Sequence, residues 1–192
     1  MEFNEGFTLT EIKESEMVAA IQEALKERKT GVWFVNEIAD GVLNCNQGAR
    51  RYDADYCDEN DIPVLKLNVG GGSIVKGSED FMMAIACQRR FRVTVAGILE
   101  NIRNVLQNHT DRAVTVNGND ILVDGVKVSG TASWVNADTI MIGSYFSFSD
   151  KSALIREICP LPRTGKVPGY IDFVTREEFK KAIASWLQVQ YE

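Results

Sequence analysis

The chain has 192 residues, of which 45% are hydrophobic and 25% are charged, proportions typical of one globular domain with a sizeable core. A formal net charge of −6 argues against a broad nucleic-acid-binding surface, and no apolar run is long enough to cross a membrane. The amino terminus lacks a signal-peptide pattern, and the cysteines form no CxxC pair, so a zinc site or disulfide framework is not expected. We therefore expect a cytoplasmic protein with free thiols at Cys45, Cys57, Cys87 and Cys159.

The first third of the chain predicts one long helix, a short helix and three strands. Thr8 and Glu11 have capping-box spacing, and apolar residues recur at helical intervals from 17 to 25, which predicts an amino-terminal helix. Strands are expected at 31–35 and 41–45, as a pair around Asp40-Gly41, and again at 62–67. The acidic stretch 53–60 between them is compatible with a short helix.

The remaining pattern alternates buried strands with amphipathic helices. The uniformly apolar run 81–87 predicts a buried central strand, and apolar residues from 98 to 106 form one helical face. A strand pair turning near 136–138 follows, with its second arm at 139–148, and a last helix begins at Thr175 and Glu178. Strands that come in hairpins with helices inserted favour the α+β class with a mostly antiparallel or mixed sheet flanked by helices.

Three consecutive glycines at 70–72 follow the strand at 62–67. A P-loop is excluded because Lys76 precedes Gly77, whereas that motif needs the lysine after its last glycine. A dinucleotide fingerprint is excluded because no helix follows the glycines. Glycines still allow close backbone approach to a ligand and let N–H groups point at an anion, although a flexible turn explains them equally well.

An Asp-Gly turn at 124–125 separates two short apolar runs, which predicts a type I′ hairpin. The register of a two-residue loop pairs Ile121 with Val128 and places Lys127 and Ser129 on the face away from the apolar side chains. A lysine held on a rigid strand beside small residues can contact a phosphate or a carbonyl oxygen. Lys127 is therefore the first candidate for a functional residue.

The order of these motifs resembles the lipoate–protein ligase family from about 31 to 148. The resemblance is carried by a strand ending in Gly-Gly-Gly, an amphipathic helix, and the segment 119–132, which reads Asn-Asp-Ile-x-Val-x-Gly-x-Lys-x-Ser-Gly-x-Ala. A weaker match lies at 42–47, where the family has a strand ending in glutamine. The resemblance implies the α+β catalytic-domain fold shared by biotin and lipoate ligases, here as a single domain over 1–192.

The resemblance also implies a reaction in two halves. Lipoate and MgATP give lipoyl-adenylate, and the lipoyl group then passes to a lysine of a lipoyl-acceptor domain. Lys127 would contact the carbonyl oxygen and phosphate of the adenylate, where a cation stabilises the developing charge. No resident metal is implied, and neither is a nucleic-acid or membrane partner. The positions implied to bind substrate are Gly70, Gly71, Gly72, Ser73, Lys76, Asn119, Asp120, Ser129, Gly130 and Gly143.

The sequence departs from the family pattern at several positions. Lys66 and Leu67 stand where the family has two arginines, Lys76-Gly77 stands where it has His-Asp, and no histidine precedes Gly143. We therefore expect no carboxy-terminal accessory domain of the kind that many relatives carry. The chain is therefore expected to be a divergent ligase, or to use pre-made adenylate or a separate accessory subunit.

Two alternatives remain open at this point. One is a homologue that binds the ligand without catalysis. The other is an octanoyltransferase acting from acyl carrier protein, which in some enzymes uses a cysteine nucleophile. Cys159, which precedes Pro160, is the cysteine to examine for that role. The arginine- and glycine-rich motif of biotin ligases is absent, which makes that activity a poorer match.

Overall fold

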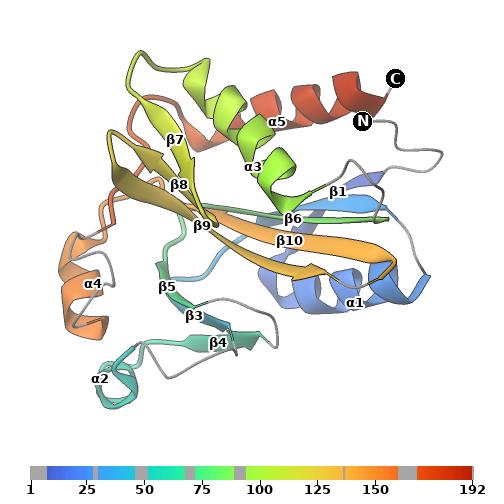
Figure 1. Cartoon of the computed structure of the whole chain (residues 1–192). Helices are drawn as coiled ribbons and strands as arrows, with labels where there is room; N and C mark the ends of the chain where they lie inside the picture. Colours follow the sequence, from blue (N-terminus) through green and yellow to red (C-terminus); the bar gives the residue numbers. More distant parts are fainter. Residues whose placement is uncertain are drawn as a thin grey trace.

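The structure is a computed structural model, and it describes residues 8–27, 30–45, 52–67, 72–88, 94–135, 137–159 and 168–191. Within these ranges a seven-stranded sheet has the order β1-β2-β6-β10-β9-β8-β7, and a three-stranded sheet has the order β4-β3-β5 (Figure 1). The large sheet consists of β1 (Thr8–Lys13), β2 (Gly31–Asn36), β6 (Phe81–Gln88), β7 (Val114–Asn117), β8 (Asp120–Val123), β9 (Val126–Val135) and β10 (Thr139–Phe146). The small sheet consists of β3 (Gly41–Cys45), β4 (Val64–Leu67) and β5 (Ser73–Lys76). The helices are η1 (Glu14–Glu16), α1 (Met17–Glu27), α2 (Ala54–Glu59), α3 (Val95–Gln107), α4 (Ser152–Ile158) and α5 (Arg176–Tyr191).

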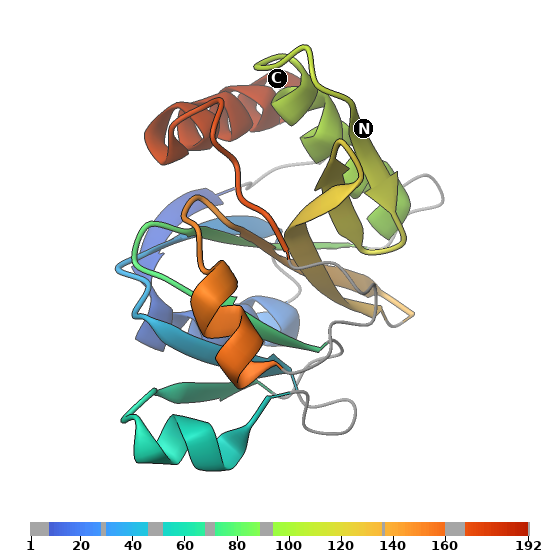
Figure 2. The same cartoon turned by 90° about the vertical axis from the view of Figure 1, so that its left-hand side faces the viewer.

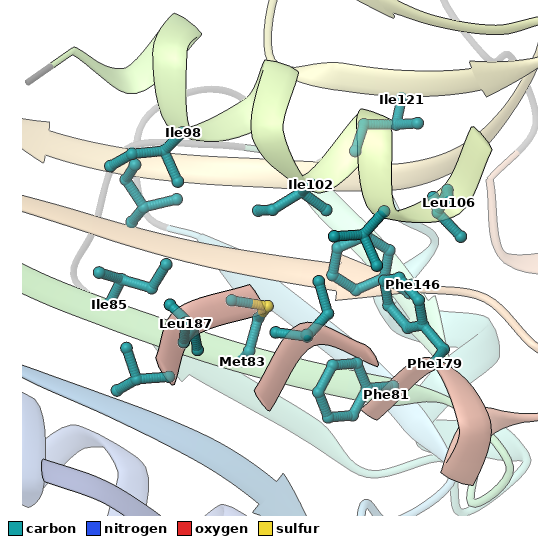
Figure 3. Close-up of a cluster of buried hydrophobic side chains, with 14 of the residues drawn as sticks. Phe81, Met83, Ile85, Ile98, Ile102, Leu106, Ile121, Phe146, Phe179 and Leu187 are labelled. Carbon is teal, nitrogen blue, oxygen red and sulfur yellow. The ribbon is translucent and has the colours of Figure 1, made fainter. Parts of the chain in front are cut away.

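The main core lies between the large sheet and helices α3 and α5. Because side chains alternate along a strand, Phe81, Met83 and Ile85 of β6 all point to this face. Phe81 packs edge-on against Phe179 of α5, with ring centroids 5.8 Å apart, and Ile102 of α3 is fully buried nearby (Figure 3). The amphipathic helices therefore pack on one face of the sheet.

The opposite face of the large sheet packs on α1 and on the small sheet. Met82 of β6 and Tyr145 of β10 belong to this second cluster, together with Leu43 of β3 and Met17 of α1. Helices α2 and α4 cover the far side of the small sheet, where Val42 and Val75 pack against Cys57 and Ile158. Figure 2 shows the resulting order, with α3 and α5 at the top and the small sheet with α2 at the bottom.

Two expectations about the first third of the chain are wrong. Thr8–Lys13 is a strand that pairs in parallel with β2, and the helix begins only at Met17. The capping-box spacing is misleading because alternating Thr8, Thr10 and Ile12 favour a strand once a partner strand is available. The strands at 31–36 and 41–45 do not pair with each other, because β3 leaves for the small sheet, where Val42 N–H donates to the Pro63 carbonyl (2.9 Å).

Most of the other expected elements are confirmed. The short helix α2, the buried strand β6, the helix α3 and the β9–β10 pair all form. The Asp124-Gly125 turn has φ angles of 49° and 74°, as a type I′ turn requires. Thr175 Oγ1 accepts from Glu178 N–H (3.2 Å), which begins α5 with the expected capping box. The sequence patterns did not predict β5, β7 or α4 as separate elements.

No helix among the described residues is long and apolar enough to span a membrane.

Candidate active site

Lys127 projects from β9 on the face of the large sheet opposite α3 and α5. Its Nζ lies 2.8 Å from Asp120 Oδ1 of the neighbouring strand β8, and both side chains are about one-third exposed, at 36% and 33%. A Cβ placed on Gly130 would lie 3.4 Å from Lys127 Nζ, so the ammonium lies directly over that glycine. The structure therefore brings together Lys127, Asp120 and Gly130, three of the residues singled out in the sequence.

A β-bulge in β9 makes this arrangement possible. Leu122 faces Lys127 and Ile121 faces Ser129, so Val128 is an extra residue and the expected pairing of Ile121 with Val128 is wrong. The bulge places Ser129 on the core face with Ile121, where its Oγ is buried and has no hydrogen-bond partner among the described residues. Ser129 therefore does not share the face of Lys127.

On the face of the large sheet that carries Lys127, small residues lie side by side on three strands. Gly143 of β10 is in register with Ala132 of β9 and with Ala84 of β6. A Cβ placed on Gly143 would meet no atom within 4 Å among the described residues, so none of them fills the space above this point of the sheet. Gly143 does not have a positive φ, so its backbone conformation does not require a glycine at this position.

Asn119 lies in the two-residue turn between β7 and β8, directly before Asp120. Its backbone carbonyl accepts a hydrogen bond from Thr131 N–H (2.9 Å), which ties this turn to β9 beyond the bulge. The Asn119 side chain itself is exposed. Asn119 thus directly precedes the carboxylate that pairs with the Lys127 ammonium.

The glycine-rich segment is described only from Gly72 onward, and Gly70 and Gly71 lie outside the described residues. The Gly72 carbonyl accepts from Cys45 N–H (3.0 Å) and so extends the pairing of β3 with β5. Ser73 shares the face of Val75, on the side of the small sheet away from the large one, and its Oγ donates to Asn44 Oδ1 (2.8 Å). Its hydroxyl therefore points away from the face of Lys127.

Lys76 is neither exposed nor available as a free cation. Only 2% of its surface is accessible, and its Nζ donates to Glu14 Oε2 (2.9 Å) and to the Ala39 carbonyl (2.6 Å). Buried charges of this kind are retained when they are paired and hydrogen-bonded. The structure thus gives Lys76 a position that joins β5 to the segment between β1 and α1.

A buried polar network that the sequence did not reveal lies beside the candidate site. Asp80, which is 1% exposed, accepts hydrogen bonds from Gly77 N–H (2.6 Å), Phe148 N–H (2.9 Å) and Lys151 Nζ (2.7 Å). The Tyr145 hydroxyl also donates to this carboxylate. Its members are far apart in sequence, so only the charge immediately before the apolar run 81–87 could have drawn attention to it.

Burial makes the four cysteines poor nucleophiles. It raises the pKa of the Cys45, Cys57 and Cys159 thiols above the ordinary value, and it raises the pKa of Cys87 to about 11. The thiolate is the reactive form of cysteine, and an elevated pKa depletes it near neutral pH. Cys159 therefore does not have the environment of an activated nucleophile.

The chain belongs to the family described as "Lipoyl protein ligase A/B catalytic domain", which its sequence matches over residues 17–171. A comparison with curated proteins finds no match.

Solved structures of lipoate ligases share the fold. LipL1 of P. falciparum in complex with lipoate is similar with a TM-score of 0.80 and 13% identity, over 97% of this chain but 62% of that one. A structure from the analysis of a bipartite lipoate protein ligase and its E2 lipoyl domain from Thermoplasma acidophilum is similar with a TM-score of 0.77 and 15% identity, over 95% of this chain and 82% of that one. Lipoate-protein ligase A bound with ATP is similar with a TM-score of 0.74 and 14% identity, over 96% of this chain and 84% of that one. The expected α+β class and mixed sheet flanked by helices are confirmed, and biotin protein ligase from Leishmania major also shares the fold (TM-score 0.54, 14% identity, over 96% of this chain and 74% of that one).

Proposed function

We propose that this protein is a lipoate–protein ligase-like acyltransferase that forms or uses lipoyl-adenylate and transfers the lipoyl group to a lysine of an acceptor domain. The observation that carries the proposal is the position of the Lys127 ammonium, over Gly130 and 2.8 Å from Asp120, on the face that is open at Gly143. Membership of the ligase family and the likeness to a lipoate-bound structure support the same chemistry.

Each of these residues has a distinct task in this reaction. Lys127 places a positive charge where the carbonyl oxygen of a bound acyl group gains negative charge as the acceptor amine attacks. Asp120 holds the flexible lysine side chain in one orientation, which reduces the entropy lost on binding. Gly143 leaves room above the sheet for the acyl chain. As the amide bond forms, the acyl–phosphate bond of the adenylate breaks, AMP leaves, and the proton of the acceptor amine passes to solvent.

ATP and lipoate are substrates in this proposal, with Mg²⁺ accompanying the nucleotide. Among the described residues no group of three or more histidine, cysteine or acidic side chains gathers as a metal site. Mg²⁺ in nucleotide enzymes is commonly held by one or two carboxylates together with substrate phosphates. Asp120 is the carboxylate in the candidate site, and it fits that limited role only when it releases Lys127.

The proposed partners are a lipoyl-acceptor domain and a separate accessory subunit, with the chain acting as a single catalytic domain in the cytoplasm. The likeness to a bipartite ligase from Thermoplasma acidophilum supports an accessory subunit. The engagement of Lys76 with Glu14 supports it as well, because Lys76 is then not free to bind phosphate. An accessory subunit would supply that positive charge from outside this chain.

The test is the intact mass of a lipoyl-acceptor domain after incubation with this protein. One sample receives lipoate and MgATP, and a parallel sample receives pre-made lipoyl-adenylate. A gain of one lipoyl group in both samples is expected of a complete ligase, whereas a gain only with the adenylate indicates that activation needs the accessory subunit. No gain in either sample contradicts the transferase proposal.

A ligand-binding homologue without catalysis is the second candidate. It is favoured by Lys66 and Leu67, which replace the family's arginines, and by the burial of Lys76. Lysine does not reproduce the bidentate contacts of arginine with a phosphate. Calorimetry with lipoyl-adenylate separates the two functions, because binding without any mass gain in the acceptor domain supports this second candidate.

A further inference from the structure

The carboxylate of Asp80 gathers hydrogen-bond donors from several segments of the chain. Oδ2 accepts from Gly77 N–H in the turn between β5 and β6, and Oδ1 accepts from Phe148 N–H just after β10. Lys151, at the start of α4, donates to Oδ1, and Ser149 Oγ lies 3.5 Å from the same oxygen. One buried carboxylate therefore fastens the end of β5, the end of β10 and α4 to one another.

Tyr145 extends this network from the large sheet to the small one. Its hydroxyl is directed at Asp80 Oδ2 and lies 3.0 Å from the carbonyl oxygen of Val75, a residue of β5. Burial and the neighbouring Asp80 carboxylate raise the pKa of Tyr145 far above its ordinary range. The hydroxyl therefore stays protonated and remains a donor, so a polar contact joins β10 directly to β5.

This contact lies beside the candidate active site. Tyr145 is in register with Gly130, the residue under the Lys127 ammonium, and it follows Gly143 by two positions on the same face of β10. The open space above Gly143 is bounded by the large sheet, and the small sheet packs on the same face. The separation of the two sheets at Tyr145 therefore limits the height of that space.

We propose that Tyr145 and Asp80 are positioning residues that fix the separation of the two sheets and thereby determine which acyl chains the site accepts. The effect on acyl-chain selectivity rests on the proposed function. The contacts of the Tyr145 hydroxyl with Asp80 and with the Val75 carbonyl, here called the tether between the sheets, do not. Neither residue needs to contact the substrate. Their effect reaches it through β5, which begins at Ser73 immediately after the glycine segment.

The informative variant is Tyr145→Phe, which removes the hydroxyl and keeps the ring. Asp80 retains its backbone donors and Lys151, so this variant is expected to fold. The matched control is Ser144→Ala on the preceding residue, which breaks a buried hydrogen bond to Thr131 Oγ1 (2.9 Å) on the other face of the same strand.

The tether is tested by hydrogen exchange of backbone amides without any ligand. Tyr145→Phe is expected to accelerate exchange in β3 and β5 by about tenfold, the effect of losing one hydrogen bond to a charged group. Exchange in β6 and β10 should stay near the wild-type rate. Equal acceleration in both sheets, or unchanged β5 exchange, overturns the proposal.

The selectivity is tested by the affinities of non-hydrolysable acyl-adenylate analogues that carry lipoyl, octanoyl or hexadecanoyl chains. Tyr145→Phe should narrow the preference between short and long chains, whereas Ser144→Ala should keep the wild-type order. An unchanged order in Tyr145→Phe overturns the role in selectivity. A wild-type protein that binds none of the analogues contradicts the proposed function and the selectivity together, and the exchange result then decides the tether alone.

Discussion

The ammonium of Lys127 lies over Gly130, although the two residues are three positions apart on one strand. In a regular strand residues at this spacing point to opposite faces. The extra residue Val128 changes the alternation, so that Lys127 and Gly130 share a face and the lysine reaches across to Asp120. A bulge next to a functional residue commonly serves to redirect a side chain, and here it directs the lysine toward the open face of the sheet.

Lys127→Ala is expected to reduce acyl transfer at least about 100-fold, the usual effect of removing one group that stabilises an oxyanion. The fold should persist because the Lys127–Asp120 pair is one-third exposed, and such pairs contribute little stability. The measurement is the rate of mass gain of an acceptor domain supplied with lipoyl-adenylate. Lys13→Ala, which breaks the exposed pair with Glu37, is the control and should retain the wild-type rate. Full activity of a folded Lys127→Ala protein would exclude the assigned role.

Gly143→Val is expected to fold normally and to lose affinity for acyl ligands. Valine suits a strand, and no described atom lies within 4 Å of the new Cβ, so the side chain occupies the open space itself. Calorimetry with a lipoyl-adenylate analogue measures the loss.

The control for that variant is Ile142→Val on the adjacent residue, which faces the opposite, fully packed core. It should lower the free energy of unfolding by about 0.5–1.5 kcal/mol and leave ligand affinity unchanged. If Gly143→Val binds the analogue as tightly as the wild type does, the acyl group lies elsewhere.

Lys151→Met is expected to destabilise the protein by about 3–5 kcal/mol, because it leaves the Asp80 carboxylate buried without its ion partner. Urea unfolding monitored by circular dichroism provides the free energy. Lys13→Met is the matched control, since its pair with Glu37 is exposed, at 62% and 69%, and should cost less than about 1 kcal/mol. Similar losses in both variants would mean that the Asp80 network contributes no more than a surface pair.

Stability is expected to fall at alkaline pH partly because of Cys87. Burial raises the pKa of this thiol from 9.0 to about 11, so between these values the folded state keeps a proton that the unfolded state loses. The contribution of Cys87 to the free energy of unfolding is constant below about pH 9 and is lost as the pH rises toward about 11. Urea unfolding in reductant at several pH values measures this slope. Cys87→Ala should make the slope shallower, and an unchanged slope would contradict the assignment.

Local sequence chemistry was sufficient wherever the determinants lie close together in the chain. The Asp124-Gly125 turn requires positive φ at two adjacent residues, and the uniformly apolar run 81–87 is typical of a strand buried on both faces. The Thr175 capping box likewise depends on a residue only three positions away. The resemblance through 119–132 identified the family for the same reason, because its residues form one continuous hairpin segment.

Contacts between segments that are distant in sequence decided the features that local patterns did not predict. The spacing of Thr8 and Glu11 is compatible with a helix, and the availability of β2 as a partner made the segment a strand. Lys76 is one of the positions that the resemblance implies to bind substrate, and the structure pairs it in the interior with Glu14, 62 residues earlier. By itself the sequence determined the ligase family, the alternation of strands and helices and the candidate role of Lys127. The tertiary structure alone decided which face Ser129 and Ser73 occupy and that Asp80, Tyr145 and Lys151 form one network, because burial and ion pairing depend on segments that meet only after folding.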